Sequence, residues 1–160
     1  MSTRNTLIAW LNDAHAMETE LQPILRNHAR DAQKNAEVRQ RIEQHVSETQ
    51  QHAERIRQAL AILGTTPSVL KSGSAAVAGL VMSVSTGMFS DELVKNALMD
   101  YATEHFEIAA YTALITAAET LGETEVAQLC RENLREEEAM AGFLAAQLPA
   151  TVKETLLTTA

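Results

Sequence analysis

His45-Val46-Ser47-Glu48-Thr49 and, further along the chain, Glu104-His105-Phe106-Glu107 are the two stretches that decide the fold of these 160 residues. Each stretch places carboxylate and imidazole groups on the seam of a long segment. Apolar residues recur there every three or four positions, which is the spacing of an amphipathic helix. A charged group buried alone on such a seam is strongly destabilising. The sequence therefore predicts long helices that meet face to face, with the seam groups compensated by partners or by bound cations.

The apolar periodicity predicts four long helices, over residues 3–30, 36–63, 91–121 and 124–148. Asn35 and Ser90 are the expected N-caps of the second and third helices, because their side chains accept hydrogen bonds from free N–H groups. Gly64 and Gly122 are expected to end these two helices as C-caps. Short connections within the first and second pairs predict two antiparallel hairpins.

The end of the chain is predicted to leave the fourth helix at Pro149. Proline lacks the N–H group that continues the helical hydrogen bonds, so Pro149 is expected to stop that helix. The tail over residues 150–160 carries apolar residues at Val152, Leu156 and Leu157. We interpret this tail as a short packing helix or a dimer contact.

The segment from Thr65 to Phe89 is almost uncharged and rich in Gly, Ala, Val, Ser and Met. Its apolar run over residues 75–88 is too short to span a bilayer. We interpret the segment as a crossover that contains a short buried helix and carries the chain along the whole bundle. The predicted fold is all-α, with a single domain over residues 1–160. It is a ferritin-like antiparallel four-helix bundle whose long crossover holds a short fifth helix.

Composition excludes several classes of partner. The formal net charge of −8 disfavours a nucleic-acid backbone and an anionic membrane surface. Cys130 is the single cysteine, so no internal disulfide forms, and the position is interpreted as a small packing residue. The first residues carry no apolar run typical of a signal peptide, and we expect a cytoplasmic protein.

Four glutamates on the four helices are predicted to meet at one depth. Glu18 lies about 15 residues before the first turn and Glu48 about 15 after it, some 20–23 Å along each helix. Glu107 and Glu136 bracket the second turn in the same way. Because the crossover puts the two turns at opposite ends of helices about 42 Å long, both pairs reach the midplane. On the fourth helix, the seam count predicts that Glu136 rather than Glu137 or Glu138 points inward.

Closely packed carboxylates repel one another unless protons or cations relieve them, and two divalent ions do so well. Carboxylate oxygens and imidazole nitrogens suit iron, the first choice, or manganese. The candidate metal ligands are Glu18, His45, Glu48, Glu104, Glu107 and Glu136. Glu48 and Glu107 are the expected bridges, with Glu18 and Glu136 as terminal ligands. Whether Glu132, His52 or His105 join them is left open.

The pattern departs from the general di-metal bundle motif of two Glu-x-x-His pairs. The second helix has the reversed order, from His45 to Glu48, and the fourth has Glu132 and Glu136 with no histidine after them. His45 is therefore interpreted either as a ligand or as an outer partner of one.

Five pieces of the chain, in order, carry a resemblance to a known family. They are Asp13 to Leu21, His45 to Thr49, Glu104 to Tyr111, Leu121-Gly122, and Glu132 to Glu137. With these motifs the chain resembles the YciF/YciE-type family of ferritin-like bacterial stress proteins. The resemblance implies a rubrerythrin-like bundle, a homodimer, a di-metal centre and a role in stress response. It implies no established reaction.

Two functions of different classes are compatible with these residues. The leading hypothesis is a di-iron or di-manganese protein that reacts with oxygen or a peroxide, as an oxidase or peroxidase. The alternative is a metal-free bundle that acts as a dimeric structural or interaction protein, which the missing second Glu-x-x-His favours. Iron storage in a cage is a weaker third hypothesis, because nothing in the sequence identifies cage contacts.

Overall fold

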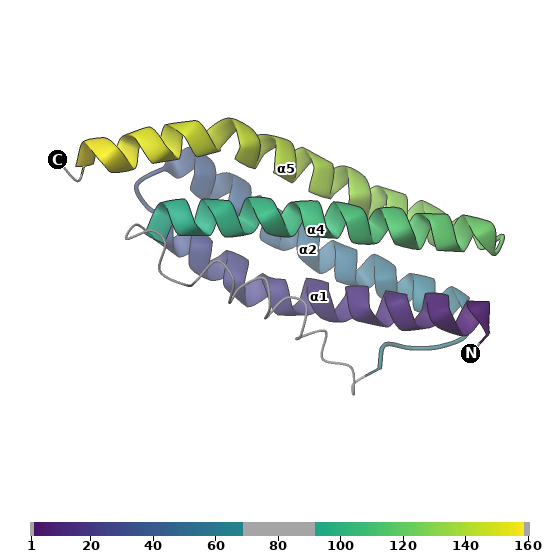
Figure 1. Ribbon diagram of the computed structural model, residues 1–160. Coiled ribbons are helices and arrows are strands. Elements are labelled where there is room, and N and C mark those ends of the chain that lie inside the picture. Colours follow the sequence, from purple (N-terminus) through teal and green to yellow (C-terminus); the bar gives the residue numbers. More distant parts are fainter. Residues whose placement is uncertain (1, 69–91, 159–160) are drawn as a thin grey trace.

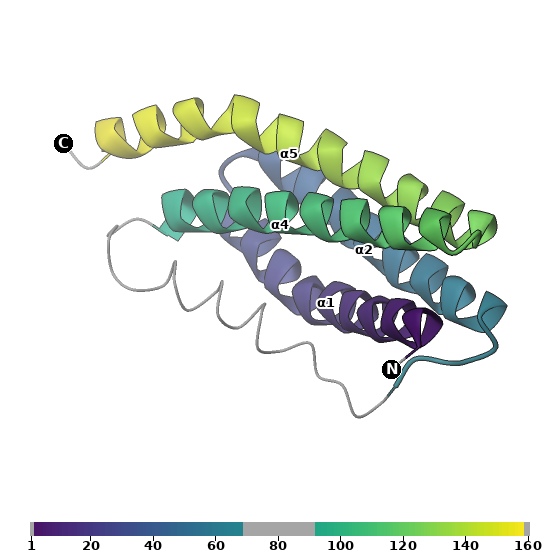
Figure 2. The same ribbon diagram turned by 45° about the vertical axis from the view of Figure 1, so that its right-hand side comes forward.

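The computed structural model describes residues 2–68 and 92–158, which form four long helices (Figure 1). These are α1 (Thr3–Asp31), α2 (Ala36–Ile62), α4 (Glu92–Thr120) and α5 (Thr124–Thr158). Helix α1 is antiparallel to α2, α4 is antiparallel to α5, and the two tight turns lie at opposite ends of the bundle (Figure 1, Figure 2). Helix α4 runs parallel to α2, as a long crossover requires.

The predicted all-α, ferritin-like four-helix bundle is confirmed, and the predicted boundaries of the first three helices agree closely with those observed. The fifth helix predicted within the crossover and the cap predicted at Ser90 lie outside the described residues.

Local hydrogen bonds explain where the helices begin and end. Ser2 and Asn35 cap α1 and α2, because their side-chain oxygens accept bonds from backbone N–H groups three residues later. Gly64 and Gly122 have φ angles of 75° and 74°, in the left-handed region that favours glycine. The backbone bonds that flank both glycines have the pattern of a Schellman motif, which satisfies the last carbonyl groups of α2 and α4.

The prediction that Pro149 stops the last helix was wrong, since α5 continues through Pro149 to Thr158. The missing N–H group costs one helical hydrogen bond, to the carbonyl of Ala145. Both residues are exposed, so water can hydrogen-bond that carbonyl instead. The predicted tail is therefore the final part of α5, where Leu156 and Leu157 are exposed.

Two apolar clusters hold the bundle together, one toward each end. The cluster toward the α4–α5 turn is built around Leu7, Leu11, Ile56, Leu60, Leu114, Val126 and Cys130. The cluster toward the α1–α2 turn is built around Leu25, Ala29, Ile42, Val46, Met140 and Leu144. Cys130 is fully buried, as its predicted packing role requires. Within the described ranges, no helix combines the length and the apolar character needed to cross a membrane.

We predict opposite effects for two glycine-to-alanine substitutions. Gly122→Ala should lower the free energy of unfolding by about 1–2 kcal/mol, because alanine is strained at a φ of 74°. Gly142→Ala, within α5, should raise it by about 0.5–1 kcal/mol, because alanine favours helix. Apart from the neighbouring backbone, no atom lies within 4 Å of the added Cβ at either position, so steric clash with other segments does not contribute. Urea denaturation of the two variants checks both signs, and equal effects would contradict this account of the turn.

Candidate metal centre

Between the two apolar clusters lies a layer of buried ionisable side chains to which all four helices contribute. Its members are Glu18 from α1, His45 and His52 from α2, Glu104 and Glu107 from α4, and Glu137 from α5. Each of the six is at most 2% exposed. Of the four glutamates predicted to meet at one depth, Glu18 and Glu107 lie in this layer, whereas α2 and α5 contribute residues other than Glu48 and Glu136. We call these six residues the polar layer.

The two histidines of the polar layer lie seven residues apart on α2, two turns along the same face. Their ring centroids are 6.2 Å apart. In each ring, one nitrogen faces the interior of the layer and the other faces a carboxylate nearer the surface.

The inner nitrogen of His45 is Nε2, which lies 3.2 Å from Oε1 of Glu104 and 3.5 Å from Oε2 of Glu137. Its outer nitrogen, Nδ1, lies 2.9 Å from Oε2 of Glu48. Glu48 also accepts hydrogen bonds from Arg41 and Gln44. The Glu48 carboxylate therefore holds the His45 ring from outside and turns the inner nitrogen toward the layer.

His52 is held in the opposite sense. Its inner nitrogen, Nδ1, lies 2.8 Å from Oε1 of Glu137 and 3.5 Å from Oε2 of Glu18. Its outer nitrogen, Nε2, lies 2.6 Å from Oε2 of Glu136, which Arg55 also binds with two N–H groups. A carboxylate on the outer nitrogen is the usual way in which proteins orient a metal-binding imidazole.

Two sets of three ligand atoms converge within the layer and share one residue. Glu18, His52 and Glu137 form one set, and His45, Glu104 and Glu137 form the other. Within each set the ligand atoms lie within 4.8 Å of one another. Glu137 belongs to both sets, so its two oxygens face two neighbouring positions.

The atoms that face these positions fit a metal. Among the described residues, Oε2 of Glu18, Nδ1 of His52, Oε2 of Glu104 and both oxygens of Glu137 have no hydrogen-bond partner. His52 Nδ1 and Glu137 Oε1 approach to 2.8 Å without lining up as a hydrogen bond. Buried polar atoms are seldom left unpaired, and a divalent cation accepts lone pairs of this kind from oxygen and nitrogen.

Electrostatics keep protons on both histidines while the layer holds no cation. Burial lowers the pKa of His45, but the contacts with Glu104 and Glu48 outweigh burial and raise the pKa to about 10. Burial likewise lowers the pKa of His52, and the contacts with Glu137 and Glu18 raise it to about 11. Two imidazolium charges thus offset two of the carboxylate charges.

The pKa shifts of the glutamates depend on how deeply each side chain is buried. Burial raises the pKa of Glu137 to about 8, because the charges of Glu18 and Glu104 add to burial and His52 only partly offsets them. Burial and the charges of Glu137 and Glu18 raise the pKa of Glu107 well above its ordinary value. Glu48, which lies nearer the surface, shows a shift in the opposite direction. Partial burial raises its pKa, but hydrogen bonds from His45 and Arg41 outweigh burial and lower the pKa to about 2.

The prediction that Glu136 points inward was wrong, because Glu137 occupies that place. The side chain of Glu137 is fully buried, whereas that of Glu136 is 31% exposed. The seam count on α5 was displaced by one residue. The buried residues Val126, Cys130, Met140 and Leu144 fit a seam that passes through Asn133 and Glu137, and they were the signal that identifies it.

The other candidate ligands lie at the predicted depth but differ in their orientation. Glu18, His45, Glu104 and Glu107 are buried in the layer, and His52, which the sequence left open, joins them. Glu48 lies on the outer side of His45, outside both convergent sets. Glu132 pairs with Arg55 near the surface, and His105 is exposed and packs its ring against Tyr101.

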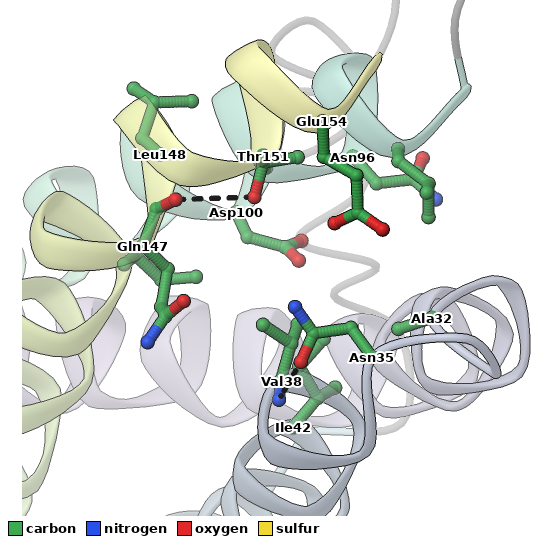
Figure 3. Close-up of a pocket in the computed structure, with 13 residues that line it drawn as sticks. Ala32, Asn35, Val38, Ile42, Asn96, Asp100, Gln147, Leu148, Thr151 and Glu154 are labelled. Carbon is green, nitrogen blue, oxygen red and sulfur yellow. Dashed lines mark hydrogen bonds between the residues drawn. The ribbon is translucent and has the colours of Figure 1, made fainter. Parts of the chain in front are cut away.

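A small cavity of about 50 Å³ lies between the α1–α2 turn and the helices α4 and α5, large enough for a few water molecules (Figure 3). Asp100 projects its carboxylate into this cavity from α4 and pairs with Nδ1 of His28 at 2.6 Å. Asp100 lies one helical turn before Glu104, and its charge is among those that raise the pKa of Glu107. Asp100 therefore links this cavity to the polar layer through its electrostatic interaction with Glu107.

Comparison with known proteins identifies the family of this chain. A family model described as a domain of unknown function (DUF892) matches residues 2–157. Protein YciF of Escherichia coli K12 is 32% identical over 142 residues, which cover 84% of this chain and 83% of YciF.

Solved structures agree with this assignment. A crystal structure of a Xanthomonas campestris pv. campestris protein has a TM-score of 0.84 and 36% identity, covering 99% of both chains. The crystal structure of the E. coli stress protein YciF has a TM-score of 0.81 and 27% identity, covering 96% of this chain and 98% of that one. YcfI of Rhodopseudomonas palustris has a TM-score of 0.81 and 29% identity, covering 91% and 94%. The resemblance inferred from the motifs is thus confirmed, and the chain belongs to the DUF892 family, together with YciF-type proteins.

Proposed function

We propose that this protein holds two divalent metal ions, iron in the first place and manganese in the second, and acts on oxygen or a peroxide in a stress response. The observation that carries the proposal is the pair of convergent ligand sets that share Glu137. Carboxylates and imidazoles drawn from all four helices are the ligands that such bundles use for iron and manganese.

Each residue of the polar layer has a role in this proposal. Glu18 and His52 would bind one ion, His45 and Glu104 would bind the other, and Glu137 would bridge the two. Glu107 lies close enough for the charges of Glu137, Glu18 and Glu104 to act on it, and it is the candidate for a second bridging carboxylate. Glu48 and Glu136, first expected to be ligands, would instead orient the two histidines from outside.

The protein groups around the layer prepare it for redox chemistry. When bound, a pair of such metals would supply redox chemistry toward oxygen or a peroxide. The apolar clusters on both sides exclude bulk water from the layer. Arg41 and Arg55 cover the two outer carboxylates and hold them in place. The residues of the layer hold protons that must leave when cations enter.

A metal-free structural or interaction protein is the second candidate, and the raised pKa values of the two histidines favour it. Two imidazolium groups neutralise much of the layer without any cation, so the fold does not require one. The two candidates differ in a simple readout. If the layer binds the ion, added manganese or iron raises the melting temperature, and Glu137→Gln removes that increase.

Two further proposals come from the resemblance and the composition. We propose a homodimer, and analytical ultracentrifugation of the native protein tests it. A mass near that of a dimer would also exclude an iron-storage cage.

We propose a cytoplasmic location because the one cysteine is buried and unpaired, which suits a reducing compartment.

Replacing the shared carboxylate tests the metal centre most directly. We expect Glu137→Gln to weaken the binding of both ions. The loss of affinity should exceed the roughly 100-fold that removal of an outer partner costs. Glu136→Gln should lower the affinity for one ion by about 10- to 100-fold, because this substitution only removes the carboxylate that orients His52. Glu138→Gln, at an exposed position next to them, is the matched control and should bind as the parent protein does. Elemental analysis and manganese titration measure the three, and full binding by Glu137→Gln would exclude the shared site.

Metal binding should release protons, because His45, His52 and Glu137 have pKa values of about 10, about 11 and about 8. All three keep protons near neutral pH and must lose them to bind a cation. Affinity for manganese should therefore rise with pH, by up to about tenfold per pH unit for each proton released. Titration calorimetry in two buffers of different ionisation enthalpy counts the protons. A pH-independent affinity would contradict the assignment of the histidines.

The metal-free protein should lose stability as pH rises above about 4.5, where Glu137 acts, and more steeply above about 6.5, where both histidines also act. The protonated forms of His45 and His52 stabilise the folded state. This stabilisation is complete below the histidine pKa of the unfolded chain, about 6.5, and is lost above the pKa values of the folded protein, about 10 and about 11. Glu137 acts in the same direction between about pH 4.5 and about pH 8, because only the folded chain keeps its proton there. Each group contributes a slope of up to about 1.4 kcal/mol per pH unit. Urea denaturation with a chelator present measures the slope, and a stability that rises with pH would contradict it.

A further inference from the structure

Asn133 lies at the centre of a buried hydrogen-bond chain that ends on one of the proposed ligands. It is fully buried on α5, one turn before Glu137. Its side-chain oxygen lies 3.0 Å from Nη1 of Arg55. Its side-chain nitrogen lies 2.9 Å from the hydroxyl of Tyr111, and that hydroxyl hydrogen-bonds to Oε1 of Glu18.

The direction of every hydrogen bond in this chain follows from Arg55. A guanidinium can only donate, so the Asn133 atom that faces it must be the oxygen. The NH₂ group of Asn133 must then face the other way, where it donates to the Tyr111 hydroxyl and, at 3.3 Å, to the backbone carbonyl of His52. Because the Tyr111 oxygen accepts from Asn133, its single hydrogen is directed to Glu18.

As a result, one oxygen of the Glu18 carboxylate accepts a hydrogen bond and the other does not. Oε1 accepts the Tyr111 hydrogen, while Oε2 has no hydrogen-bond partner among the described residues and faces His52. Tyr111 is itself fully buried, so water does not replace this contact. The geometry thus leaves Oε2 as the Glu18 oxygen that no hydrogen bond occupies, and favours it as the atom that faces a metal.

We propose that Asn133 is a positioning residue that, through Tyr111, makes Glu18 a one-oxygen ligand. This inference rests on the proposed metal centre and goes beyond it by making the two metal positions unequal. The ion that Glu18 and His52 would hold depends on the chain from Arg55. Among the described residues, no hydrogen bond joins His45 or Glu104 to Asn133 or Tyr111.

Cobalt(II) titration of the full-length protein tests this, because cobalt has visible absorption bands that weaken as its coordination number rises. Tyr111→Phe removes one oxygen and frees Oε1 of Glu18. Asn133→Asp removes the NH₂ donor, so the Tyr111 hydroxyl can turn to the introduced carboxylate and release Glu18. Tyr101→Phe is the matched control, the same substitution on the same helix about 15 Å away along the axis.

The expected result is selective. Tyr111→Phe and Asn133→Asp should each bind one cobalt ion as the parent protein does and the other about 10- to 100-fold more weakly, with weaker absorption bands for that ion alone. Tyr101→Phe should match the parent protein. If the parent protein binds two ions and both test variants match it, the positioning role is wrong. If the parent protein binds none, the proposed function itself fails first. Circular dichroism confirms folding, and Tyr111→Phe decides the outcome if Asn133→Asp does not fold.

Discussion

The constraint on which this structure depends is the burial of four carboxyl groups and two imidazoles in one layer of a helical bundle. Each group would be costly to bury alone, and removing one partner of a buried charge pair costs about 3–5 kcal/mol. The six side chains are therefore compatible with the fold only together, in register, with protons or cations between them. A shift of any helix by one turn would separate the groups that compensate one another.

The rest of the bundle divides its tasks around that layer. The two apolar clusters supply the burial that drives folding and keep bulk water from both sides of the layer. Capped helix ends and left-handed glycines set where each helix starts and stops, and so set the depth of each ionisable residue. At the margin, Arg41 and Arg55 hold Glu48 and Glu136 against the outer nitrogens of the histidines. Those contacts direct the inner nitrogens toward the shared Glu137.

Family membership and site chemistry answer different questions here. The match over residues 2–157 and the similarity to solved structures of YciF-type proteins establish the fold and the family. A reaction depends on the chemistry of the site, because one fold can carry many functions. The unpaired atoms of the polar layer and their convergence are the features that favour metal binding. The protonated histidines explain how the same layer is also stable without a cation.

The sequence by itself determined the all-α bundle, the boundaries of its first three helices and the depth at which side chains meet. These features depend on local rules: the 3.6-residue apolar period, capping residues and a rise of about 1.5 Å per residue. Only the tertiary structure decided which side chains turn inward. Neighbouring helical residues point about 100° apart, so a seam displaced by one residue exchanged Glu136 for Glu137. Pro149 within α5, the outward turn of Glu48 and the path from Asn133 to Glu18 likewise depend on contacts between segments distant in sequence, which local patterns do not encode.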